Sequence, residues 1–151
     1  MSSSFITKDD EHGFWINDGL MEVACWGLVC VIDRELSANP PWLIELRDHL
    51  YKNSQGFFAS YMHLSLDIFL VNNEREIGFL EVIAKAKLFF LEWGNHIPMS
   101  ELNTFQISEG AKRIWNCPLE TARAVNILNY LEDVIKDRIN IKASDEINYV
   151  F

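Results

Sequence analysis

The sequence predicts an all-α fold, a compact bundle of about five to six helices. Apolar residues recur at helical spacing along several stretches, and residues that cap or stop helices separate those stretches. Hydrophobic residues make up 49% of the 151 residues and aromatic residues 13%, which is enough for a core built around large rings. We expect residues 14–151 to form a single helical domain. Residues 1–13 are polar and acidic, and we expect a flexible arm there.

The first expected helix covers residues 20–36, with Asn17 or Asp18 as its cap. Its middle, VACWGLVCVI, is apolar on all sides, which is typical of a buried helix or a buried strand. The length, the cap and the polar end at residues 33–35 favour a helix. After the break SANPPW, Pro41 falls in the first turn of a second helix, which Gly56 is expected to stop.

Residues 57–71 fit two patterns. Apolar and polar residues alternate from Met62 to Leu70, which is typical of a strand. Apolar residues also recur at helical spacing from Phe57 to Val71. We favour a helix, with a strand as the alternative.

The next helix has the clearest period. Its expected buried seam is formed by Ile77, Leu80, Ala84, Leu88 and Leu91. Gly94 and Asn95 end it, and a short helix is expected after Ser100. Asn116-Cys117-Pro118 is expected to start the last helix, and the expected seam of that helix is Ala124, Leu128, Leu131, Ile135 and Ile139.

Charge and cysteine content narrow the function classes. The net charge of −9 is spread along the chain: residues 1–75 hold 5 basic and 11 acidic groups, and residues 76–151 hold 8 and 11. Such a surface repels nucleic acid and anionic membranes and attracts basic proteins or metal cations; the alternative is that the charge serves solubility alone. Three cysteines, an odd number, argue against a disulfide framework. The N-terminus does not resemble a signal peptide, and the longest apolar run is half a membrane span, so we expect a cytoplasmic protein.

The motifs of common catalytic and cofactor sites are missing from the sequence. The four histidines form no HExxH pair, and the seven glycines form no phosphate-binding loop, so we expect no metal and no cofactor. One pair remains: His63 and Asp67 are four residues apart and would meet on a helix. A small helical enzyme or metal-dependent hydrolase that uses this pair is therefore an alternative, although a hydrogen-bonded polar face explains the pair more simply.

The order of the segments resembles a known family. NPPWLIELRDHLYKNSQGFF, YMHLSLDIFL and EIGFLEVIAKAKLFFLEW follow one another in a short acidic chain, a layout similar to small immunity proteins of bacterial toxin systems, including contact-dependent growth inhibition. The resemblance covers roughly residues 14–139 and rests on length, charge and helix order. It implies a cytosolic antidote that occludes the active site or substrate groove of a toxin domain, in many cases a basic nuclease.

The leading hypothesis is therefore a non-enzymatic immunity protein that binds a cognate toxin stoichiometrically. Acidic residues that point away from the apolar seams are the candidates for partner binding: Glu74, Glu76, Asp133 and Asp137. A third hypothesis is a helical adaptor or homodimer that uses apolar surface near Trp42 or Trp115.

Overall fold

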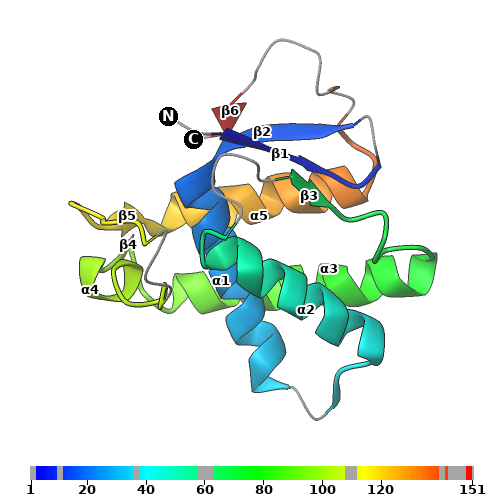
Figure 1. Cartoon of the computed structure of the whole chain (residues 1–151), viewed down its shortest axis with the longest axis horizontal. Coiled ribbons are helices and arrows are strands. Elements are labelled where there is room, and N and C mark those ends of the chain that lie inside the picture. Colours follow the sequence, from blue (N-terminus) through cyan, green and yellow to red (C-terminus); the bar gives the residue numbers. More distant parts are fainter. Residues whose placement is uncertain are drawn as a thin grey trace.

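A computed structural model of the chain combines helices with two sheets, so the all-α prediction is wrong and the fold is mixed α/β (Figure 1). It describes residues 3–9, 12–35, 38–57, 63–107, 112–139, 142 and 149–150. The strands are two to five residues long, and strands this short carry little periodic signal in a sequence.

The larger sheet has four strands in the order β3-β1-β2-β6. β1 (Ser3–Thr7) runs antiparallel to β2 (Gly13–Asn17), while β3 (His63–Ser65) is parallel to β1 and β6 (Tyr149–Val150) is parallel to β2. β1 is an inner strand and Phe5 and Ile6 are buried, so residues 3–7 are not the loose arm that the sequence suggested. The polar composition of residues 1–13 misled the prediction because the apolar pair is short.

The preference for a helix at residues 57–71 is wrong where the structure describes the segment. His63–Ser65 form β3, and a turn follows at residues 67–69. Residues 58–62 lie outside the described residues. β1 explains the outcome: Ile6 pairs with Leu64, and the Leu66 amide donates to the Thr7 carbonyl at 2.9 Å. A strand edge from a distant part of the sequence decides between the two patterns.

Helix α1 (Asp18–Arg34) lies at the centre of the molecule, packed against α2, α3 and α5 (Figure 1). The predicted cap is confirmed, because the Asn17 side chain accepts a hydrogen bond from the Gly19 amide at 2.9 Å. Nearly every residue from Asp18 to Ile32 is buried, which agrees with the expected buried helix.

The predicted second and last helices are also confirmed. α2 (Pro41–Ser54) begins at the expected proline, and Gly56 follows it with a φ of 75°. α4 (Met99–Leu102) is the short helix. α5 (Thr121–Ile135) buries Ala124, Leu128, Leu131 and Ile135 as expected, but it begins after Pro118 and ends before Ile139.

Helix α3 (Asn73–Leu91) is where predicted, but it buries the opposite face. Its buried residues are Phe79, Val82, Ile83, Ala86, Phe89 and Phe90. The predicted seam was wrong because both faces of α3 are apolar. The face with three phenylalanines removes more area from water, so it faces the core.

A two-stranded antiparallel sheet sets the end of α3 beside the start of α5. β4 (His96–Ile97) follows α3, and β5 (Leu119–Glu120) precedes α5. The Thr121 amide also donates to the Asn95 carbonyl at 2.9 Å. In the described part of the chain, no helix is both long enough and apolar enough to cross a membrane.

Candidate protein-binding surface

The outer face of α3 carries a row of exposed apolar side chains, which we call the α3 ridge: Ile77, Ala84, Leu88 and Leu91. At about 3.6 residues per turn these positions lie within roughly 60° of one another around the helix. Ile77 is 50% exposed, Leu88 63% and Leu91 53%. Single exposed apolar residues are common, but several along one helix face are typical of a surface that binds another protein.

Acidic side chains accompany the N-terminal half of the ridge. Glu81 lies on the same face between Ile77 and Ala84, and Glu74 lies in the first turn of α3. Both are exposed, and neither forms an ion pair with the described residues. This end of the ridge is therefore apolar with free negative charge, which complements a basic apolar surface.

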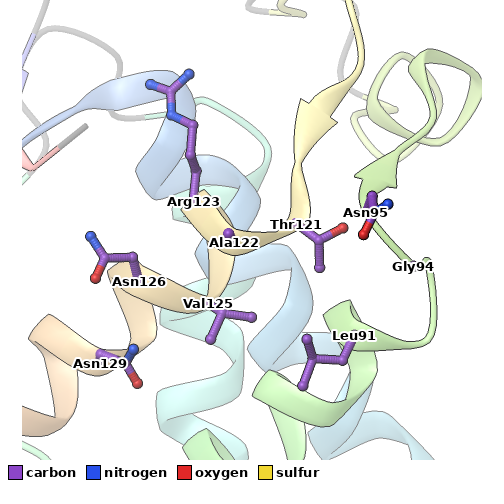
Figure 2. A pocket seen from close by; sticks show the side chains of 9 residues that line it. All are labelled: Leu91, Gly94, Asn95, Thr121, Ala122, Arg123, Val125, Asn126 and Asn129. Atoms are coloured by element: carbon purple, nitrogen blue, oxygen red, sulfur yellow. The ribbon is translucent and has the colours of Figure 1, made fainter.

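The C-terminal half of the ridge borders an open groove of about 640 Å³ between α3 and α5, the α3–α5 groove (Figure 2). Leu91, Gly94 and Asn95 line it on one side. On the α5 side it is lined by Thr121, Arg123, Val125, Asn126 and Asn129. In Figure 2, Val125 points toward Leu91, whereas Arg123 and Asn126 project from the outer side of α5. The groove thus has an apolar floor and a polar rim.

Two polar groups of the groove lack partners in the described part of the chain. The Thr121 hydroxyl is buried, in a residue that is 2% exposed, and has no hydrogen-bond partner among the described residues. Arg123 has no ion-pair partner among the described residues. At the far end of the groove the charged groups are paired, because Lys87 of α3, one turn before Leu91, donates a hydrogen bond to Glu132 of α5. Hydrogen bonds from Lys136 and Lys87 lower the pKa of Glu132 to about 2.

A smaller groove of about 200 Å³ lies on the other side of the ridge, between α1 and α3. Ion pairs cross it: Lys85 bonds to Glu35 at 2.7 Å, and Arg34 lies 3.8 Å from Glu92. The guanidinium of Arg34 also lies over the Phe89 ring. Because its charged groups are already paired, this groove offers a ligand less than the α3–α5 groove does.

The four acidic residues predicted for partner binding lie toward one end of the α3–α5 pair. Lys8 lies between two of them, 2.9 Å from Glu76 and 3.3 Å from Asp137, and these ion pairs raise the pKa of Lys8 although burial opposes them. Asp133 contacts Arg138 at 3.4 Å, and Glu74 has no ion pair with the described residues. Three of the four therefore hold the chain's own cations. Sequence reasoning missed these pairs because their partners are distant or follow the helix end.

The geometric basis of the His63–Asp67 pair does not exist in the structure. His63 lies in β3 and Asp67 in the turn after it, so the four-residue spacing does not place them on one helical face. Within the described ranges, no three His, Cys, Asp or Glu side chains gather in a way that could hold a metal ion.

Trp42 and Trp115, which the sequence suggested as interface residues, are partly buried against the core. Trp42 also lies under the guanidinium of Arg75, 5.7 Å from ring centre to carbon. Ile114, the neighbour of Trp115, is itself 77% exposed, and the row of exposed apolar side chains along a helix face lies on α3. Two apolar faces on one helix were the signal in the sequence that could have found it.

No protein-family model, curated protein or solved structure matches this chain.

Proposed function

We propose that this protein is a cytoplasmic immunity protein that binds and neutralises a cognate bacterial toxin domain, of the basic nuclease class, in a stoichiometric complex. The α3 ridge is the observation that carries the proposal. Leu88 and Leu91 are 63% and 53% exposed, so burial of the exposed part against a partner would stabilise a complex by roughly 1–2 kcal/mol for each side chain.

Charge supports a basic partner. The chain has a net charge of −9, and Glu74 and Glu81 are acidic groups beside the ridge that form no ion pair with the described residues. Free acids of this kind attract the positive cleft of a nuclease and speed its encounter, while the apolar ridge provides most of the affinity. Of the four acidic residues predicted from the sequence, Glu74 is the one that we place at this interface.

The test is a growth-rescue assay with the product of the reading frame that adjoins the gene for this chain. We expect that product to arrest growth, wild type to restore it, and the two proteins to co-purify at 1:1. Leu88→Arg should abolish rescue. The matched control is Ile68→Arg, because Ile68 is equally exposed but lies on the turn after β3.

Urea unfolding must first show that both variants are folded. The proposal fails if the neighbouring product is harmless, or if wild type does not neutralise it. Equal rescue by Leu88→Arg and wild type would show that the α3 ridge is not the binding surface.

A further inference from the structure

We propose that the α3–α5 groove binds an internal segment of the partner in which an aspartate or glutamate lies next to an aliphatic side chain. This inference rests on the proposed function and names the chemistry of one part of its interface. The acidic end of the ridge then binds basic groups of the partner, and the groove binds an acidic group. This difference fixes the direction in which the partner lies along α3.

The carboxylate is assigned from Arg123, in the first turn of α5. No carboxylate among the described residues pairs with Arg123. The N-terminus of a 15-residue helix adds partial positive charge, which the exposed cap residue Glu120 offsets in part. In a chain that carries nine excess negative charges, an unpaired arginine beside a groove favours a negative ligand group.

The Thr121 hydroxyl is a second, independent sign of a ligand. It lines the same groove, is buried, and has no hydrogen-bond partner within the part of the chain that the structure describes. Buried hydroxyl groups are normally hydrogen-bonded, so an orphan beside a groove indicates a missing acceptor or donor. A small opening of the groove would let a ligand oxygen accept from it.

The rest of the groove fits a short extended segment. Leu91 and Val125 form a floor for one aliphatic side chain. Asn126 and Asn129 are exposed, and their carboxamides can both donate to and accept from a main chain. From Thr121 to Asn129 the helix rises about 12 Å, which matches about four residues of extended chain. A second copy of this protein is a poor occupant, because the net charge of each copy repels the other.

The experiment is selection from a random heptapeptide library joined to a coat protein through its C-terminus. No displayed peptide then has a free C-terminal carboxylate, so acidic enrichment must come from side chains. We expect enriched peptides to carry Asp or Glu within two residues of Leu, Ile, Val or Phe. Arg123→Glu should weaken their binding at least tenfold, and exchange of the peptide's acid for lysine should restore it.

Two further variants make the result specific. Lys52→Glu is the matched control, because Lys52 is an exposed cation on α2, and it should bind the peptides as wild type does. Thr121→Val keeps the side-chain shape but removes the hydroxyl, so it should weaken peptide binding without destabilising the free protein.

The inference is overturned if no peptide is enriched, if enrichment shows no acidic preference, or if Arg123→Glu binds the selected peptides as tightly as wild type. Growth rescue separates this failure from failure of the proposed function. If Leu88→Arg loses rescue while Arg123→Glu keeps it, the immunity function stands and the groove has no acidic ligand.

Discussion

Arg113 holds the carboxylate of Glu22 in the protein interior through two hydrogen bonds, Nε to Oε2 at 3.0 Å and Nη2 to Oε1 at 3.2 Å. Glu22 lies in α1 and is 1% exposed. The side-chain nitrogen of Gln106 donates to the same carboxylate at 2.9 Å, and the side-chain oxygen of Gln106 accepts from the main-chain amide of Arg113. The bond to Glu22 raises the pKa of Arg113. One buried acid thus ties the segments on both sides of residues 108–111 to the central helix.

We predict that Arg113→Met lowers the free energy of unfolding by about 3–5 kcal/mol, because it leaves a buried carboxylate without its counter-charge. The double variant Glu22→Leu/Arg113→Met should recover most of that loss, since neither charge is then buried. Urea unfolding at pH 7 measures both values. A loss below about 1 kcal/mol for the single variant would show that water reaches Glu22.

The packing of α1 on α3 gives a second prediction. A Cβ built on Gly27 would lie 2.3 Å from the Phe90 ring, so any side chain there forces the ring aside. Gly27→Ala should cost about 1–3 kcal/mol despite the better helix propensity of alanine. The double variant Gly27→Ala/Phe90→Leu should recover part of the lost free energy of unfolding. Thermal unfolding of the single and double variants would show this. Additive losses would mean that the two sites do not meet.

The three free cysteines should react in a fixed order. Cys117 is exposed, whereas burial and then the Asp33 charge raise the pKa of Cys30 to about 11. Burial and then the Glu22 charge raise the pKa of Cys25 as well. At pH 8 roughly one Cys30 thiol in a thousand is the reactive thiolate. Mass spectrometry after iodoacetamide should find Cys117 modified first and Cys25 only in urea; early modification of Cys25 would contradict its burial.

Helix positions followed from local signals, and the sheet did not. Asn17 caps α1, Pro41 starts α2, and Gly94 with a φ of 76° follows α3, so each boundary depends on residues beside it. β1 and β3 depend instead on each other across more than fifty residues, with Ile6 opposite Leu64. Pairing at that separation leaves no signature in a window of single-sequence pattern.

The candidate surface could not be predicted from the sequence, for a different reason. Periodicity reports an apolar face but not what covers it, and α3 has two such faces. Phe90 packs beside Gly27 of α1, so it faces inward, and Leu88 on the other side remains exposed. The ion pairs of the predicted acidic residues could not be foreseen for a similar reason, because Lys8 reaches Glu76 and Asp137 from the β1–β2 connection.

The Glu132 cluster predicts a pH dependence. The folded-state pKa of Glu132, about 2, lies below the ordinary value of 4.5, so its ion pairs stabilise the fold above pH 4.5. That contribution is lost as pH falls from 4.5 through 2. Glu132→Gln should therefore be less stable than wild type by up to about 1 kcal/mol at pH 6, with the difference shrinking toward pH 2. A constant difference in urea unfolding across this range would contradict the assignment.

Substitutions on the two faces of α3 should differ in their effect on the free energy of unfolding. Ile83 is fully buried, so Ile83→Ala should lower the free energy of unfolding by about 2–5 kcal/mol. Leu88→Gln and Leu91→Gln remove exposed apolar groups and should change it by less than about 0.5 kcal/mol. Urea unfolding of the three variants at equal concentration checks this. A loss of 2 kcal/mol or more at Leu88 would mean that the α3 ridge is covered in the free protein, and the surface would then be unavailable to a partner.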